Sequence, residues 1–410
     1  MPDKRLESYT AALHFAEKQV LQLTKTYPDY FPMYTVGGKW HHTGELWTHW
    51  TDGFLGGMMW QFHIRHRDAA AHVIKTDDAH LAHDPWRGRA EHYSKLLEHR
   101  RHDRTVHDLG FIFLSTYLPW YELTGEESHH QILIEAGETL ALRFMEKGQY
   151  LRSFVAPESL FIDIMMNVPI IFYAAVETGN ADLARIATNH CRTTRDTIVR
   201  PDGSTAHEGI FDLETGKFLR QGTHQGLSPD SAWARGLAWS LYGYSKCYAL
   251  TGNPEFLAVA ERNAKYWIEH LPDDGVPFWD FDADLSQPAP WGAQKESSAG
   301  AIAASGLLDL AHQTSSPELA EKYRNTALAT LDSLVRPQYL ASETPGWEGI
   351  LKHGVYHTAK NLGVDESVMW GEYFFVEALT KVVCNQFQRV SDESLSRNRE
   401  RYAKLMGNLS

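Results

Sequence analysis

The chain has 410 residues, of which 43% are hydrophobic and 22% are charged, a composition typical of a globular protein with a large core. The formal net charge of −13 excludes the basic surface with which proteins bind nucleic acid. No apolar run reaches the roughly 18 residues of a membrane-spanning helix, because even the segment 161–176 contains Asp163 and Asn167. The sequence therefore predicts neither nucleic acid nor a membrane as a partner.

The cysteines and the first residues of the chain bear on its location. The first ten residues carry charges but are not followed by the apolar stretch of a secretion signal. The three cysteines are odd in number and far apart in the sequence, at Cys191, Cys247 and Cys384. We expect reduced thiols and a cytoplasmic location.

The helices are predicted from apolar residues that recur at spacings of three and four, whereas the alternation typical of strands is scarce. Three apolar stretches end in Thr-Gly, at 124–125, 178–179 and 251–252, and a new helical stretch begins just after each. The expected helices are 3–26, 50–66, 85–102, 109–124, 127–147, 163–178, 181–199, 231–250, 253–271, 296–313, 316–335 and 366–386. This repetition predicts an all-α fold in which six helical hairpins close into a ring.

The two helices of each pair differ in character. The second is apolar all round, as in an inner ring, and the first is amphipathic, as in an outer one. Long loops precede the second helix, at 27–49, 148–162, 200–230, 272–295 and 336–365. Because long loops in a compact domain are usually functional, we expect the active cavity at the end of the barrel where they gather. No linker divides the chain, so we predict one domain over 1–410, with residues 69–85 as a surface insertion.

Two acids stand among apolar residues at the start of inner helices. They are Asp108, before Leu109-Gly110-Phe111, and Asp163, between Ile162 and Ile164. Each alone is explained by a helix N-cap. Together, across the mouth of the barrel, burial and mutual repulsion would raise one pKa and create a general acid. Paired carboxylates of this kind cleave glycosidic bonds.

Aromatic and basic residues near these acids suggest a sugar-binding cleft. The chain has 13 Trp, 18 Tyr and 18 Phe, and flat aromatic faces stack on sugar rings, although core packing is the alternative. Trp50 precedes one inner helix, whereas Trp60 fits core packing. Arg235, two residues after Trp233, could present its guanidinium to a carboxylate or could bind loop carbonyls instead. His207, Gln225, Lys295 and Tyr356 also lie in the long loops.

Metal and cofactor motifs are missing from the sequence. The 22 histidines include no His-Glu-x-x-His, and the pairs His63/His66 and His80/His83 lack a companion set of ligands. The segment 226–230 is not a nucleophile elbow, and no dinucleotide fingerprint or P-loop occurs. We predict no metal and no cofactor.

Nine short motifs in the chain resemble those of the unsaturated glucuronyl hydrolases, glycoside hydrolase family 88, in the order typical of that family. They are Trp50-Thr51-Asp52-Gly53-Phe54, His107-Asp108-Leu109-Gly110-Phe111, Ile162-Asp163 with Asn167, Arg200-Pro201-Asp202-Gly203-Ser204-Thr205 with His207, Gly222-Thr223-His224-Gln225-Gly226, Trp233-Ala234-Arg235-Gly236, Trp279-Asp280-Phe281, Ser297-Ser298-Ala299 and Trp370-Gly371-Glu372-Tyr373. The resemblance implies an (α/α)6 barrel. It also implies removal of the Δ4,5-unsaturated uronic acid that polysaccharide lyases leave at the non-reducing end of an oligosaccharide.

The resemblance assigns roles to individual residues. Asp163 resembles the acid/base residue and Asp108 its essential partner, and the substrate-contacting set corresponds to Trp50, His207, Gln225, Trp233, Arg235 and Tyr356. The implied reaction is a hydration in which Asp163 protonates C4 of the vinyl ether. Water activated by the same carboxylate then adds at C5, and the hemiketal opens and expels the rest of the sugar. An acid that is protonated near neutral pH, beside a negative Asp108, is required.

The chain also departs from the family pattern, and these departures concern the leaving sugar. They are Leu55-Gly56-Gly57 after the first motif, Phe154 where Trp is usual, Ala206 for Tyr, and Lys295-Glu296 for a basic residue followed by Asp. Because the net charge opposes an anionic substrate, we expect local cations, Arg235 with His207 and Lys295, to dominate at short range.

Three alternatives remain open at this stage. The first is a conventional inverting glycosidase, with Asp108 and Asp163 as base and acid toward a saturated sugar. The second is a sugar isomerase or epimerase on a similar barrel, and the third is a non-catalytic carbohydrate-binding barrel, which would not need both acids. The sequence makes no prediction of the oligomeric state or of the parent polysaccharide.

Overall fold

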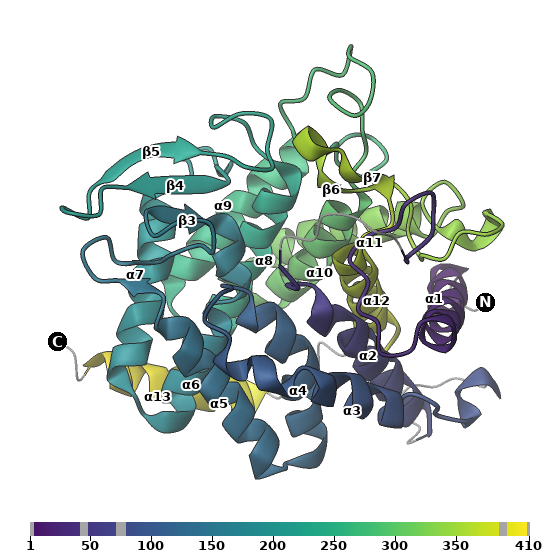
Figure 1. Ribbon diagram of the computed structural model, residues 1–410, viewed down its shortest axis with the longest axis horizontal. Helices are drawn as coiled ribbons and strands as arrows, with labels where there is room; N and C mark the ends of the chain where they lie inside the picture. The colour runs from purple at the N-terminus through teal and green to yellow at the C-terminus, as the bar shows by residue number, and fades with distance from the viewer. Residues whose placement is uncertain (1–3, 42–47, 71–78, 385–391, 408–410) are drawn as a thin grey trace.

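Two concentric rings of helices form the body of the protein in the computed structural model, which describes residues 4–41, 48–70, 79–384 and 392–407 (Figure 1). The outer helices are α1 (Lys4–Thr26), α3 (Arg87–Leu96), α5 (Glu127–Ala141), α7 (Ala181–Thr197), α9 (Pro254–His270) and α11 (Pro317–Leu334). The inner helices are α2 (Asp52–Ala70), α4 (Leu109–Thr124), α6 (Pro169–Thr178), α8 (Ala234–Thr251), α10 (Ser297–Gln313) and α12 (Met369–Val383).

The inner ring closes on itself. Each inner helix contacts the next in the order α2, α4, α6, α8, α10 and α12, and α12 in turn contacts α2. The inner helices are apolar nearly all round, and in α10 every residue from Ser297 to Leu307 is buried. The outer helices bury one face only, as in α7 and α9. The predicted all-α (α/α)6 barrel, with the second helix of each pair inside, is therefore confirmed.

Short links and long loops lie at opposite ends of the barrel. The short links run from an inner helix to the next outer one, and the glycines that end α4, α6 and α8 have φ angles of +67°, +69° and +66°. These are left-handed conformations, which glycine adopts without strain. The long loops run from an outer to an inner helix, except that residues 71–86 separate the inner helix α2 from the outer helix α3. The N-terminal ends of the inner helices consequently share one end of the barrel with these loops.

Three small antiparallel sheets lie in the long loops and were not predicted. Their strands are β1 (Phe144–Met145) with β2 (Tyr150–Leu151), β3 (Ser159–Phe161) with β4 (Glu208–Phe211) and β5 (Phe218–Gly222), and β6 (Gly354–His357) with β7 (Leu362–Glu366). In Figure 1 the labelled strands β3 to β7 lie along the upper side of the molecule. Pairing of β3 with β4 joins the loop before α6 to the loop before α8 and brings Asp163 near His207.

Several predicted boundaries are wrong. The helix predicted over 127–147 ends at Ala141, because the chain turns into the β1–β2 hairpin. The helix predicted over 163–178 begins at Pro169, which has no N–H and suits the first turn of a helix. The residues before it form the 3₁₀ helix η3 (Ile162–Met166). The predicted helix 85–102 is divided at Leu97 into α3 and η2 (Glu98–His102).

Further elements lie outside the barrel. A thirteenth α-helix, α13 (Asp392–Gly407), was not predicted, and it packs against α6, α7 and α8. The other 3₁₀ helices are η1 (Ala79–Ala82), η4 (Ala341–Glu343) and η5 (Thr358–Lys360). Residues 71–78 of the predicted insertion, and residues 3, 385 and 386 of predicted helices, lie outside the described residues. None of the helices described here combines the length and apolar character needed to cross a bilayer.

Candidate active site

The two predicted acids lie at the loop end of the inner ring. Asp108 immediately precedes α4, and its carboxylate makes no capping hydrogen bond. Asp163 lies in η3, just before α6. The Asp108 side chain is 5% exposed and that of Asp163 is 13% exposed. Because Asp108 does not cap α4 through its side chain, the N-cap interpretation does not explain its burial.

A buried histidine faces Asp108. The backbone N–H of Phe154 donates to His107 Nδ1 over 3.1 Å, and His107 Nε2 lies 3.4 Å from Asp108 Oδ1. Burial holds the pKa of His107 well below its ordinary value, so the ring is neutral near pH 7. A neutral ring that accepts at Nδ1 carries its proton on Nε2. His107 therefore directs an N–H toward Asp108.

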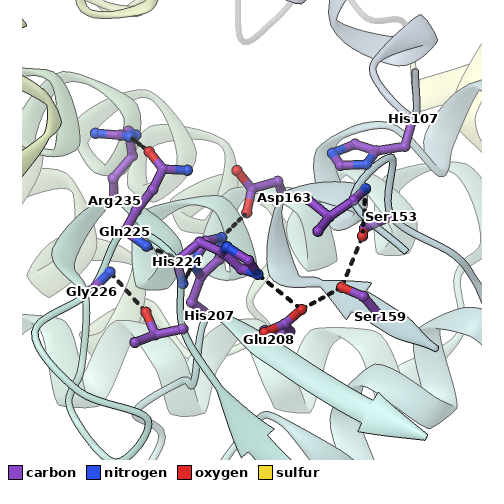
Figure 2. A network of polar contacts seen from close by, with 12 residues as sticks. His107, Ser153, Ser159, Asp163, His207, Glu208, His224, Gln225, Gly226 and Arg235 are labelled. Carbon is purple, nitrogen blue, oxygen red and sulfur yellow. Dashed lines mark hydrogen bonds and ion pairs between the residues drawn. The ribbon is translucent and has the colours of Figure 1, made fainter. Parts of the chain in front are cut away.

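The same arrangement recurs at Asp163. The backbone N–H groups of His224 and Gln225 approach His207 Nδ1 at 3.0 and 3.2 Å, and His207 Nε2 lies 3.5 Å from Asp163 Oδ2. Burial again holds the pKa of His207 well below its ordinary value. His207 is thus a neutral Nε2–H donor and not the local cation that the sequence suggested. Figure 2 shows this histidine beside Asp163.

The two carboxyl groups share one proton near neutral pH. Burial, with the charge of Asp163 as the next cause, raises the pKa of Asp108 to about 8. Burial raises the pKa of Asp163 to about 6, and the positive charge of Arg235 opposes this rise. Between these values the substrate-free pair keeps its proton on Asp108. The sequence placed it on Asp163, and that difference arises because Arg235 favours the ionised form of Asp163.

Arg235 is the buried cation of the site, in the first turn of α8. One terminal nitrogen donates to the carbonyl of Val355, and the other donates to Gln225 Oε1 and, over 2.9 Å, to the carbonyl of Tyr356. Burial lowers the pKa of Arg235 from its high ordinary value, and the guanidinium remains charged near neutral pH. The Nε–H group has no protein partner. The guanidinium thus binds loop carbonyls, the alternative left open above.

The predicted aromatic platforms differ in accessibility. Trp233 is 2% exposed, with the Arg235 guanidinium carbon 4.4 Å from the centre of its indole and the His207 ring 4.6 Å away. Trp233 therefore packs against Arg235 and His207 and has almost no exposed face. Trp50 is half-buried and packs at 4.8 Å against Trp370, which leaves part of it accessible. Tyr356, on β6, is buried beside Trp370 at 5.4 Å. Trp60 belongs to the core, as expected.

The residues around Lys295 take no direct part in holding a substrate. Lys295 Nζ lies 2.7 Å from Asp274 Oδ1 and also donates to the carbonyl of Val276, so its charge is already paired. Glu296 caps α10, where its carboxylate accepts from the backbone N–H of Ala299. Of the three local cations expected from the sequence, Arg235 alone remains charged and close to the acids.

A polar chain behind His207 was missed by the sequence analysis. Ser153 Oγ donates to Ser159 Oγ, which donates to Glu208 Oε1 over 2.6 Å, and His224 Nε2 lies 3.2 Å from the same oxygen (Figure 2). This chain fixes His224, whose backbone in turn fixes His207. Two of the motifs contained His207 and His224, and Glu208 directly follows His207 in the chain, but sequence spacing alone cannot reveal the bonds between these segments.

Within the described part of the chain, one group of side chains has the spacing to bind a metal ion. It consists of Glu17, His66 and His80. Glu17 and His66 are buried. Glu17 Oε1 also lies 3.0 Å from Arg65 Nη1, and Arg65 is 1% exposed. The guanidinium already balances the carboxylate charge, so the cluster forms a buried ion-pair network. Because His66 lies near the end of α2, this network is remote from the acids.

Comparison with known proteins is consistent along most of the chain. The family model for Glycosyl Hydrolase Family 88 matches residues 22–368. An unsaturated glucuronyl hydrolase from Bacillus sp. (strain GL1) is 30% identical over 372 residues, 87% of this chain and 92% of the relative. An unsaturated chondroitin disaccharide hydrolase from Streptococcus agalactiae is 30% identical over 344 residues, 82% of this chain and 81% of the relative. The crystal structure of an unsaturated glucuronyl hydrolase specific for heparin is similar with a TM-score of 0.78 and 28% identity, covering 98% of both chains.

Proposed function

The chain belongs to glycoside hydrolase family 88 and hydrolyses unsaturated glucuronyl oligosaccharides, and we propose that Asp163 and Asp108 perform this reaction by hydrating the double bond of the unsaturated ring. The buried pair of acids carries this assignment, because their pKa values of about 6 and about 8 leave one proton on the pair at neutral pH. Protonation of a carbon needs such an acid, and the carboxylate that remains after this transfer can activate water.

Substrate binding places the proton on Asp163. The uronate carboxylate binds on the Arg235 side of the cavity and offsets the positive charge that favours ionised Asp163. The pKa of Asp163 then rises, and the shared proton moves to it from Asp108. Asp163 delivers this proton to C4, and the electron pair of the C4=C5 bond forms the new C–H bond. The cation left at C5 is stabilised by the ring oxygen.

The same carboxylate completes the reaction. Ionised Asp163 takes a proton from water as the water oxygen bonds to C5. The resulting hemiketal at C5 opens by breaking its bond to the ring oxygen, and C1 becomes a hemiacetal. Collapse of that hemiacetal expels the remaining sugar and leaves an aldehyde at C1. The Nε2–H groups of His107 and His207 lie 3.4 and 3.5 Å from the two carboxylates and favour their ionised forms electrostatically.

The binding residues divide into those that touch the sugar and those that shape its cavity. Trp50 offers an accessible aromatic face on which the flattened ring stacks. The amide nitrogen of Gln225, the hydroxyl of Tyr356 and Nε of Arg235 bind its polar groups. Trp233 holds Arg235 and His207 in place from behind. All of these groups lie at the loop end of the barrel.

A spectroscopic assay tests the proposal. The conjugated alkene-carboxylate absorbs in the ultraviolet, and this absorbance should disappear when the protein is incubated with disaccharides made by chondroitin or heparin lyases. Asp163→Asn serves as the control and should leave the absorbance intact. Release of sugar without loss of absorbance would favour the inverting-glycosidase alternative. Comparing the two disaccharides also identifies the preferred leaving sugar.

The cellular location is also proposed. Cys191 and Cys247 are buried thiols that form no disulfide, and Cys191 Sγ lies 3.9 Å from Cys247 Sγ. A pair of thiols this close supports a reducing compartment, and we infer the cytoplasm. Fractionation of the source cells, with the protein followed by antibody, tests this inference.

A further inference from the structure

A buried asparagine links the two segments that carry the acids. Asn167 is 0% exposed and ends η3 four residues after Asp163. Its Oδ1 accepts the backbone N–H of Phe111 over 2.8 Å, in the first turn of α4. Its Nδ2 donates to the backbone carbonyl of Asp163 over 3.2 Å. One side chain therefore holds both the start of the helix after Asp108 and the backbone of Asp163.

The backbones also meet at this point. A Cβ added to Gly110 would lie 2.4 Å from the Asn167 Cα and 2.7 Å from its carbonyl oxygen. These distances are shorter than real Cβ contacts, so only glycine allows α4 and η3 to approach this closely. Gly110 lies two residues after Asp108. The close contact and the two hydrogen bonds are independent observations of the same joint.

From these contacts, and resting on the proposed function, we propose that Asn167 is a positioning residue that sets the relative placement of the Asp108 and Asp163 carboxyl groups and thereby tunes how they share a proton. Asn167 itself does not touch the reacting atoms. Its amide pairs the buried backbone N–H of Phe111 and adds a donor to the carbonyl of Asp163. Because a displacement of about 1 Å at a catalytic group costs on the order of 100-fold in rate, the joint is directly coupled to turnover.

Two substitutions test the proposal. Asn167→Ala removes both hydrogen bonds, and we expect kcat to fall at least about tenfold with a smaller change in KM. Asn167→Asp keeps an acceptor for Phe111, removes the donor to Asp163 and adds a negative charge beside the pair. It should move both limbs of the pH–rate profile to higher pH, because a neighbouring anion raises carboxyl pKa values. In the uncharged Asn167→Ala variant, a purely structural role would leave the limbs unmoved.

Asn263 provides a matched control. It is also 0% exposed, accepts from Ser240 Oγ over 2.8 Å and donates to the carbonyl of Gly203 over 2.7 Å. Asn263→Ala thus removes a comparable pair of bonds away from the acids, and it should reduce thermal stability without moving the pH limbs. If Asn167→Ala does not fold, Asn167→Asp decides. Wild-type kcat and limbs in Asn167→Asp would overturn the positioning role, whereas an active Asp163→Asn would overturn the proposed function instead.

Discussion

Asp108 and Asp163 show how burial, mutual repulsion and one nearby guanidinium create a pair of acids suited to proton transfer. Each is surrounded by apolar residues and by one neutral histidine, so solvent stabilises neither charge fully. Repulsion keeps both from ionising together, and Arg235 decides which one ionises first. The protein pays for this arrangement in stability, and the cost depends on pH.

Asp163→Asn should remove nearly all turnover, since the amide keeps the shape of the carboxylate but cannot cycle a proton. General acid–base groups contribute about 10²- to 10⁴-fold, and we expect a loss in that range with binding mostly intact. Asp108→Asn should be similarly severe. Steady-state kinetics on a lyase-generated disaccharide provide the measurement. A rate above about a tenth of the wild type in either variant would contradict the assignment.

Asp108→Asn should also stabilise the fold as the pH rises. The pKa of Asp108 is raised to about 8 in the folded protein, so the folded state binds this proton more tightly than the unfolded state. Its stability contribution is complete below about pH 4 and is lost as the pH rises to about 8. The asparagine variant does not undergo this loss. Its free energy of unfolding relative to the wild type should therefore rise by at most about 5 kcal/mol by pH 8. Chemical denaturation at pH 5 and pH 8 measures it, and an equal difference at both would contradict the raised pKa.

A plot of kcat/KM against pH, which reports the pKa values of the substrate-free enzyme, should be bell-shaped. Below about pH 6 both carboxyl groups are protonated, and Asp108 no longer supplies the negative charge that the reaction requires beside Asp163. Above about pH 8 both are ionised, and no acid remains to protonate C4. The limbs of kcat/KM should therefore lie near these two values. A kcat/KM that stays flat from pH 5 to pH 9 would show that the pair does not titrate in turnover.

At the scale of elements, α8 is joined to β6 by Arg235, whose terminal nitrogens bind the carbonyls of Val355 and Tyr356. The loop before α12 is thereby fixed against the loop before α8. The same residue supplies the charge that opposes the rise in the pKa of Asp163. Arg235 thus both holds β6 against α8 and opposes the rise in the pKa of Asp163.

Arg235→Ala should lower kcat/KM by about 10- to 100-fold, the loss of a charge-assisted partner worth about 1.5 to 3 kcal/mol. It should also move the acid limb of the pH–rate profile above about pH 6, because the charge that favours ionised Asp163 is gone. Arg235→Lys, which keeps the charge but not the fork, should retain that limb while still losing affinity. An acid limb that does not move in the alanine variant would place Arg235 too far away to act on Asp163.

The sequence predicted helices well and the loop contacts poorly, for physical reasons. Apolar spacing and the Thr-Gly ends report local structure, so the twelve barrel helices and their inner or outer placement could be predicted. The β3–β4 pairing could not, because each strand is only three or four residues long and its partner is distant in the chain. For the same reason the sequence did not predict the hydrogen bonds of Asn167 and Arg235. Helix α13 escaped because its first turns are almost wholly polar.

At the scale of the whole molecule, a net charge of −13 has to be reconciled with an anionic substrate. Screening limits exposed charges to about 8 Å at physiological salt, whereas buried charges are screened much less. Arg235 lies buried in the cavity, and Lys295 is paired with Asp274. A buried cation beside the acids can therefore act on the substrate at short range, and the barrel determines where that charge lies relative to the acids.

The reaction itself provides the most decisive prediction, because two acids alone cannot distinguish hydration of an alkene from displacement at an anomeric carbon. If Asp163 protonates C4, turnover in D2O should place one deuterium on that carbon. The label should be stereospecific, because Asp163 is fixed on one side of the cavity by η3. Nuclear magnetic resonance of the product measures both properties. A saturated glucuronide should react poorly, since it has no double bond to protonate and no flattened ring to stack on Trp50. Rapid hydrolysis of that analogue, with no deuterium at C4 of the product from the unsaturated substrate, would require displacement on the same barrel.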